Sequence, residues 1–412
     1  MTPKLNTLAL AVMALYASTA NADDAMMPTF SLSSFGTAGI VHSSEKNADF
    51  TSSIYKPNGA GHTRNWDADV DSLIGAQVIA TFTPQLSAVV QVISEQRYDN
   101  SYNPSLEWAN FKYQFSPDFS VRVGRTVQPA FLLSDSRKVG YTLPWVRPPG
   151  EVYSLIPVTS TDGMDLSYRL HFAELTNTVQ GNFGQSGPRL PNNTGRSLAR
   201  DSWGISNLTE YGALTTRLTY QKTRLTLESL NSLFDSFRGF GEEGNAIADR
   251  YDTKEKPFDF VGAGVIYDPG KWFVMGEWGR TDSHAAIGTI SAWYVSGGYR
   301  IAAFTPYVTY ARSKTTSATS TAGLDTSTLS PSLAATATDL NSALNTVLAG
   351  NSGQQTLSVG MRWDFTQNMD AKLQYDRTRL DHNATGPLTN LQPGYEPGGS
   401  FNLFSLAVDF VF

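Results

Sequence analysis

The sequence predicts an all-β protein, a transmembrane antiparallel up-and-down β-barrel of about sixteen strands. Three observations predict this fold. Segments of about ten residues alternate apolar and polar side chains, as tilted strands with one face in lipid and one in water do. The connections between these segments alternate between short and long. After the N-terminal segment, no run approaches the roughly 18 apolar residues of a membrane-spanning helix.

The composition fits a folded membrane barrel and excludes several other classes. Of the 412 residues, 41% are hydrophobic and 17% are charged, which excludes disorder for most of the chain. The absence of cysteine excludes a disulfide framework, a thiolate zinc site and a cysteine nucleophile. The net charge of −6 argues against nucleic acid as a partner, because phosphate binding needs a basic face.

Residues 1–22 have the pattern of a secretory signal peptide. Lys4 supplies the positive start, an apolar stretch runs from Leu8 to Ala17, and Ala20-Asn21-Ala22 matches the small-residue cleavage pattern. We therefore predict that the chain leaves the cytoplasm and that residues 23–412 form the barrel.

The expected strands follow from alternation with a period of two. In 355–365, Leu357, Val359, Met361 and Trp363 share one face and Arg362 lies on the other. The strands are expected near 29–42, 72–82, 86–97, 108–115, 119–126, 164–172, 174–183, 201–209, 213–222, 258–268, 271–281, 290–301, 303–313, 355–365, 370–380 and 400–412. An apolar face of this kind suits lipid, and a polar face suits a wet lumen.

The connections support the barrel more strongly than any single strand does. Seven are tight turns, as at Ser116-Pro117-Asp118 and Asp268-Pro269-Gly270, and eight are longer. Sixteen up-and-down strands need seven short and eight long connections when both termini lie on the short-turn side. A secreted β-sandwich or solenoid would have shorter strands and no such regularity.

Two of the long connections are expected to hold short helices. In 223–257, Leu230, Phe234 and Phe237 repeat with helical spacing up to Gly239. In 314–354, Leu340 and Leu344, with Val347 and Leu348, do the same up to Gly350.

The final segment completes a resemblance to a known family. Leu406, Val408, Phe410 and Phe412 place apolar residues at every second position and end the chain on an aromatic residue. With the signal peptide, the cysteine-free acidic chain and the sixteen strands, this resembles a Gram-negative outer-membrane porin. The resemblance implies a water-filled channel for passive diffusion of small hydrophilic solutes and ions. It also implies a homotrimer in outer-membrane lipid and lipopolysaccharide, with no cofactor.

In porins of this class the third long connection folds into the barrel and narrows the pore, which the resemblance assigns here to residues 127–163. The apolar residues of this segment, Phe131, Leu132, Leu133 and Trp145, need a place to be buried. The alternative is an outward loop at a subunit contact. The expected constriction residues are Asp135, Arg137, Lys138, Arg147 and Glu151. Their mixed charges lack the acidic motif of enterobacterial general porins, so cation preference is not implied.

Four arginines are the expected charges of the pore wall: Arg122, Arg169, Arg217 and Arg362. Each lies in the middle of a strand, where facing lipid would cost about 2–4 kcal/mol, so each is expected to face the lumen. The alternative is that these arginines only form structural pairs with neighbouring carboxylates.

Other motifs point away from catalysis and metal binding. Residues 239–244 match G-x-G-x-x-G but follow no parallel strand, so we expect a loop there. Asp67, Asp69 and Asp71 lack the glycine and glutamate of a calcium loop, so no metal ligand is assigned. The alternatives are a loose divalent site on the outer surface and a plain solvated strand end. None of the five histidines (His42, His62, His171, His284 and His382) accompanies a nucleophile-elbow or zinc-binding motif. The alternatives to an open channel are a substrate-selective porin for organic anions or sugars, an outer-membrane hydrolase and a plugged structural barrel.

Overall fold

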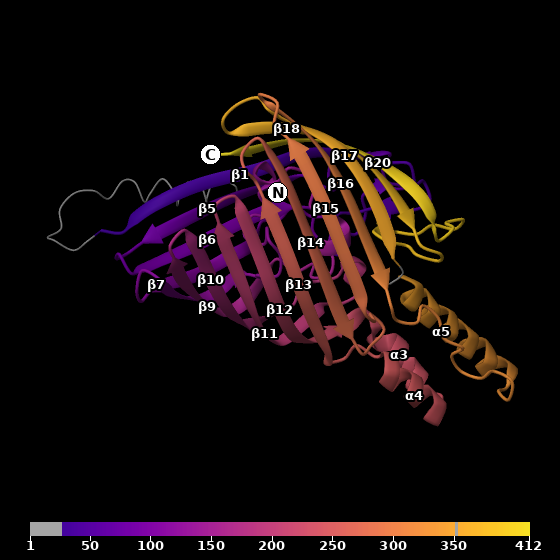
Figure 1. Ribbon diagram of the computed structural model, residues 1–412. Coiled ribbons are helices and arrows are strands. Elements are labelled where there is room, and N and C mark those ends of the chain that lie inside the picture. The colour runs from indigo at the N-terminus through magenta and orange to yellow at the C-terminus, as the bar shows by residue number, and fades with distance from the viewer. Residues whose placement is uncertain (1–26, 351–352) are drawn as a thin grey trace, which may run out of the picture.

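The computed structural model describes residues 27–350 and 353–412, so the predicted signal peptide lies outside the described residues. Sixteen antiparallel strands form the wall of a barrel (Figure 1). They are β1 (Thr29–Ser43), β5 (Leu73–Thr81), β6 (Leu86–Glu95), β7 (Ser105–Gln114), β8 (Phe119–Val127), β9 (Ser160–Phe172), β10 (Leu175–Ser186), β11 (Ser197–Tyr211), β12 (Leu214–Leu227), β13 (Lys256–Tyr267), β14 (Trp272–Ser283), β15 (Ile290–Tyr299), β16 (Phe304–Thr315), β17 (Gln354–Asp364), β18 (Met369–Leu380) and β20 (Gly399–Val411).

The barrel is closed by its first strand. β1 pairs with β5, as in Phe35 opposite Gly75, and also with β20, as in Ala38 opposite Val408. Every other strand pairs with its neighbours in sequence, which is the predicted up-and-down topology. Closure matters because an open sheet edge would leave backbone N–H and C=O groups without partners in the bilayer.

The two faces of the wall carry the predicted side chains. On β17, Leu357, Val359 and Trp363 are 47%, 53% and 46% exposed on the outer face. Their polar neighbours Ser358 and Arg362 point into the barrel, where both contact lumen residues. None of the helices in 27–350 and 353–412 has the length and hydrophobicity that crossing a bilayer would require.

The predicted alternation of short and long connections is confirmed. The tight turns gather at one end of the barrel and the longer connections at the other. We call four of the long connections L1 (44–72), L3 (128–159), L5 (228–255) and L8 (381–398).

The helices predicted in two long connections are also confirmed. L5 holds α3 (Asn231–Arg238) and α4 (Gly241–Tyr251), and the connection between β16 and β17 holds α5 (Pro331–Gly350). Phe234 and Phe237 of α3 are buried in a common core with Leu344 and Leu348 of α5. The three helices extend beyond the end of the barrel (Figure 1).

One sequence expectation about L5 was wrong. Residues 239–244 do not form a plain loop, because Gly241 begins α4. Gly239 ends the preceding helix, and Gly241 adopts a φ of +71°, which lets the chain turn between the two helices. Glu242 and Glu243 then occupy the first turn of α4, where the helix dipole favours acidic side chains.

L1 and L8 are joined to each other at the long-connection end of the barrel. The short strands β2 (Asp49–Phe50), β3 (Ala60–Gly61) and β19 (Leu388–Thr389) form a small sheet that connects them. A fourth short strand, β4 (Trp66–Asp67), returns L1 to β1. Phe50 and Leu388 pack in one core with Phe401 and Leu403 of β20.

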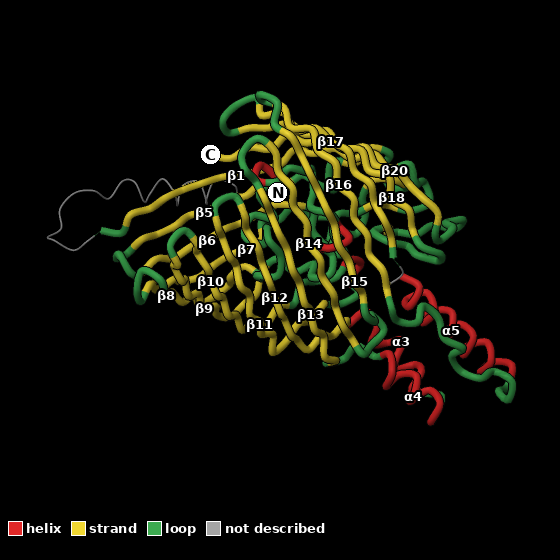
Figure 2. Tube along the Cα trace, viewed as in Figure 1, coloured by secondary structure: helices red, strands yellow, loops and turns green. Residues whose placement is uncertain are grey.

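L3 lies inside the barrel. It contains the short helices η1 (Gly140–Thr142) and α2 (Gly150–Tyr153). Further short 3-10 helices, η2 (Pro191–Asn193) and η3 (Glu228–Leu230), belong to other connections. Loop and helix segments are visible within the ring of strands in Figure 2.

Candidate functional site

An apolar face of L3 packs on the inner wall of the barrel. Phe131 and Trp145 are 3% and 1% exposed, and they share one core with Phe260 of β13 and Tyr294 of β15. The indole Nε1 of Trp145 donates to Ser296 and Thr309, both at 2.9 Å. The expectation that these apolar residues are buried against the wall is confirmed, and the alternative of an outward loop was wrong.

A buried carboxylate on the wall holds the first part of L3. Glu277 of β14 accepts hydrogen bonds from the backbone N–H of Leu132 at 2.8 Å and from the Tyr153 hydroxyl at 2.6 Å. The hydroxyl of Tyr294 donates to the same side chain at 2.9 Å. Because both Leu132 and Tyr153 belong to L3, Glu277 connects two segments of the loop to one strand.

Arg147 holds the second part of L3. Its guanidinium contacts both oxygens of Asp71 in L1, at 3.0 and 2.6 Å, and Asp376 of β18 at 3.1 Å. It also donates to Ser405 of β20 at 2.7 Å and stacks over the ring of Phe50. Burial works against the charge of Arg147, but Asp71 and Asp376 outweigh it and raise its pKa. L1, L3 and the wall therefore meet at a single cation.

The backbone of L3 between these anchors is held by two wall cations. Arg362 donates to the carbonyl oxygens of Tyr141 at 2.6 Å and Leu143 at 3.0 Å. Lys372 donates to the carbonyl oxygen of Gly140 at 2.7 Å. A Cβ atom at Gly140 would overlap the carboxylate of Asp409, so the loop approaches the wall here only with glycine.

Three more of the predicted constriction residues also have partners. Arg137 donates to the carbonyl oxygens of Tyr153 and Ile156 within L3, at 2.9 and 3.1 Å. Lys138 pairs with Glu95 of β6. Glu151 is buried, and its Oε1 accepts from Gln354 and Thr356 of β17. Burial raises the pKa of Glu151, because no cation is bonded to this carboxylate in the described chain.

The apolar core of L3 lies on β13–β16, and the wall formed by β7–β12 carries basic side chains. Arg122 pairs with Asp165 at 2.8 Å, and Arg217 is buried, donating to Ser206 and to the carbonyl oxygen of Pro129. Arg169 is exposed and makes no side-chain hydrogen bond or ion pair within the described residues. Lys112 lies close enough to Arg122 and Arg169 to interact with both electrostatically.

Asp135 belongs to the same part of the lumen. It is exposed on L3, and it interacts electrostatically with Asp165 and Arg217. The structure thus separates the predicted site residues into two groups. One group contacts L3 or joins it to the wall: Arg137, Lys138, Arg147, Glu151, Arg217 and Arg362. The other group, Asp135, Arg122 and Arg169, lies in the part of the lumen beside β7–β9.

Sequence reasoning missed the role of L1. The tip of L1, residues 51–56, reaches over the lumen, and Tyr55 lies beside Ser197 of β11 and near Arg137 of L3. In the sequence, Asp71 belongs with Asp67 and Asp69 to an incomplete calcium loop, but in the structure Asp71 pairs with Arg147, while Asp67 and Asp69 pair with Arg64. The only available signal was the excess of acidic residues in L1 and of basic residues in L3, and this signal does not specify partners.

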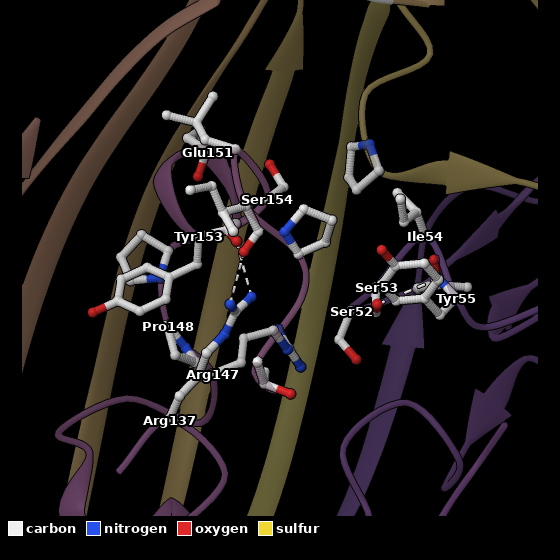
Figure 3. A pocket seen from close by; sticks show the side chains of 18 of the residues that line it. Ser52, Ser53, Ile54, Tyr55, Arg137, Arg147, Pro148, Glu151, Tyr153 and Ser154 are labelled. Carbon is white, nitrogen blue, oxygen red and sulfur yellow. Dashed lines mark hydrogen bonds between the residues drawn. The ribbon is translucent and has the colours of Figure 1, made fainter. Parts of the chain in front are cut away.

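A cavity of about 700 Å³ lies between the tip of L1 and L3, on the long-connection side of the loop. Figure 3 shows Ser52–Tyr55 of L1 on one side of it and Arg137, Arg147 and Ser154 of L3 on the other. The ends of β11 and β12 nearest the long connections also line the cavity, for example with Ala199 and Leu225.

Together these features define a class of protein. A closed barrel with a lipid-facing outer surface, a polar interior and a loop fixed along one side of its lumen is a membrane channel. Residues 9–383 match the family model described as Gram-negative porin, and the chain belongs to that family. It is an outer-membrane channel for the passive diffusion of solutes.

Solved structures share this fold at low sequence identity. The anion-selective porin from Comamonas acidovorans has a TM-score of 0.54 and 10% identity, with 94% of this chain and 100% of that chain covered. OmpF of Salmonella typhi, solved with daunomycin, has a TM-score of 0.55 and 13% identity, covering 93% and 97%. The trimer form of OmpT from Vibrio cholerae has a TM-score of 0.53 and 8% identity, covering 93% and 99%. No curated protein matches the chain.

Replacing Arg147 tests whether L3 depends on this anchor. Arg147→Gln leaves Asp71 and Asp376 buried without a cation, which we expect to cost about 3–5 kcal/mol locally. L3 should then detach from the wall, giving larger fluctuations of single-channel current and faster proteolysis within 128–159. Arg64→Gln is the matched control, because Arg64 is 50% exposed and its pairs with Asp67 and Asp69 lie within L1 and do not involve L3. Equal current noise in the two variants would contradict the assignment.

The raised pKa of Glu151 predicts a stability that depends on pH. The penalty for its charge is absent below the unfolded pKa, about 4.3, and grows as pH rises through the higher folded value. Glu151→Gln should therefore raise the denaturation midpoint in lipid vesicles at pH 7 and leave it unchanged below about pH 4.

The exposed Glu210 provides the control for this prediction. Glu210→Gln should change the midpoint little at either pH. A Glu151→Gln variant that is less stable than the parent at pH 7 would show that the carboxylate is stabilising.

Proposed function

We propose that this porin favours anions and that solutes pass between L3 and the wall formed by β7–β12. The observation that carries the proposal is the exposed guanidinium of Arg169 on this side of the lumen, which has no ion-pair partner among residues 27–350 and 353–412. The opposite side is occupied by L3 and its anchors at Glu277 and Arg147.

The charges around this passage favour anions. The basic side chains are Lys112, Arg122 and Arg169, and the acidic ones within electrostatic reach are Asp135 and Asp165. Asp165 is paired with Arg122, so the remaining cations outnumber the remaining carboxylate. Pore selectivity depends on radius and lining charge, and an excess of fixed positive charge raises the local concentration of anions.

The predicted constriction residues take different roles in this proposal. Asp135 faces the passage and partly offsets the basic wall. Arg137, Arg147 and Glu151 act indirectly, because they fix the path of L3 and so set the width of the channel. Lys138 and Glu95 neutralise each other where L3 approaches β6.

We also propose that the protein is a homotrimer. The family and the trimer form of the Vibrio cholerae neighbour support this. A second support is a hollow of about 560 Å³ on the outer surface of the barrel, lined by apolar residues such as Ala38, Met361 and Leu373. The mass of the detergent-solubilised protein tests it: three copies are expected, and a stable monomer would contradict it.

A hydrolase is not favoured. Within the described residues, the hydrogen bonds of histidine side chains go to Asn65 and Thr176, and His171 also contacts Asp118 at 3.3 Å. None of these partners is a serine, which a Ser–His mechanism would need.

The reversal potential in a salt gradient tests the anion preference. We expect the parent channel to favour chloride over potassium. Arg169→Glu should shift the permeability ratio toward potassium by about fivefold or more, the effect of roughly 1 kcal/mol from a charge near the ion path. Arg238→Glu on α3 makes the same charge change outside the lumen and should leave the ratio unchanged. A parent channel that favours potassium would contradict the proposal.

A further inference from the structure

The cavity between L1 and L3 has the size and chemistry of a ligand site. Its volume of about 700 Å³ lies within the range of about 300–1,000 Å³ found for small-molecule pockets. Such pockets are mostly apolar and contain a few polar groups that orient the ligand. This cavity is separate from the basic wall around Arg169, because its lining on β10–β12 comes from the long-connection ends of those strands.

Much of the cavity lining is apolar. Residues from L1, L3, β12 and the connection after β14 contribute to it: Ile54, Pro148, Pro149, Leu155, Leu225 and Ile287. Ile54 is 52% exposed although it lies at the cavity. A wide aqueous vestibule for ions alone does not require an exposed isoleucine at this point, and the side chain gains from contact with an apolar ligand.

The polar groups of the cavity leave a positive charge without a carboxylate partner. Arg147 is bonded to Asp71 and Asp376, and Lys138 is bonded to Glu95. Arg137 differs, because within the described part of the chain its guanidinium hydrogen-bonds only to the neutral carbonyl oxygens of Tyr153 and Ile156.

Two other ionisable side chains of the lining also lack a directly bonded partner of opposite charge. Lys56 donates to the carbonyl oxygens of Asp69 and Val70. Glu151 is buried and hydrogen-bonded to Gln354 and Thr356. Because Arg147 has two carboxylate partners, these lining charges balance overall, and Arg137 and Lys56 are local cations without a directly bonded carboxylate in the described chain.

Tyr55 adds a hydrogen-bond donor on the L1 side. Burial raises its pKa to about 12, so its hydroxyl remains protonated at neutral pH. Figure 3 shows Tyr55 and Arg137 on the two sides of the cavity. A carboxylate held near Arg137 would leave the rest of a ligand against Ile54, Pro148 and Leu225.

We propose that this cavity binds monoanionic organic solutes with a bulky apolar body, such as aromatic carboxylates, before they pass L3. The proposal rests on the channel function above, because the ligand must reach the cavity from the long-connection side. It goes further by naming a ligand class and a site. A small hydrophilic anion gains nothing from the apolar lining, and a neutral aromatic compound gains nothing from Arg137.

The test uses the refolded full barrel in planar bilayers with a probe added on the long-connection side. Naphthoate combines a carboxylate with an apolar body, acetate keeps only the charge, and naphthamide keeps only the body. We expect naphthoate to interrupt the current with an apparent dissociation constant at least about tenfold lower than that of either control compound.

Variants locate the site. Ile54→Ser should weaken the naphthoate block by about fivefold, since it removes apolar contact area from an exposed side chain whose loss does not threaten the fold. Ile54→Leu should keep the block. Leu333→Ser removes an apolar side chain of similar exposure, 50%, from α5 outside the cavity and should also keep it.

Arg137 requires a paired comparison, because it also supports L3. Arg137→Gln should weaken the block by about tenfold, and Arg137→Lys should restore most of it by retaining the charge. If both variants lose the block and change the open-channel conductance, the effect comes from L3 and the assignment of Arg137 is wrong.

The same recordings separate this proposal from the anion preference. Absence of a naphthoate block in a channel that favours chloride would overturn the binding site alone. A naphthoate block in a channel that favours potassium would overturn the anion preference alone. An equal block by naphthamide, or a block unchanged in Ile54→Ser, would overturn the site.

Discussion

The need to satisfy every backbone hydrogen bond within the bilayer is the constraint on which the rest of this structure depends. Hydrocarbon offers no partners, so a sheet can cross a membrane only if it has no free edge. Here β1 removes the edges by pairing with both β5 and β20. Closure then fixes the alternation of side chains, because lipid surrounds the outer face and water fills the inner one. It also creates an enclosed space in which a loop can be held.

L3 converts this enclosed space into a pore with two unlike sides. Its apolar residues pack on β13–β16, and its polar contacts are made by buried charges, chiefly Glu277 and Arg147. Removing one partner of a buried charge strongly destabilises the folded protein, so these contacts hold the loop in one defined position. The side that L3 leaves uncovered carries Lys112, Arg122 and Arg169. The anchors therefore determine which wall residues the solute meets.

The strand pattern was predictable because a wall strand encodes both of its environments locally. The alternation in 355–365 is enough to place Val359 toward lipid and Arg362 toward the lumen, and the structure has both. The helices α3 and α5 were predictable for a similar reason, since Phe234, Phe237, Leu344 and Leu348 repeat with helical spacing. The turn residues of the short connections predicted the up-and-down order of the strands.

The contacts within the lumen were not predictable from local pattern. Arg147 meets Asp71 and Asp376, which lie 76 and 229 positions away in the sequence. No period or motif pairs such residues, and a one-residue error in register would change which charges face each other. The inward path of L1 was hidden for the same reason: Tyr55 and Lys56 look like ordinary loop residues until the barrel brings β11 and L3 beside them.

Single-channel recording of the purified, folded protein in planar bilayers tests the central claim most directly, namely that L3 leaves an open aqueous path along the β7–β12 wall. The account predicts discrete, long-lived current steps that are ohmic at low voltage. A membrane that stays silent after insertion of correctly folded barrels would contradict it, because L1 and L3 would then close the lumen completely.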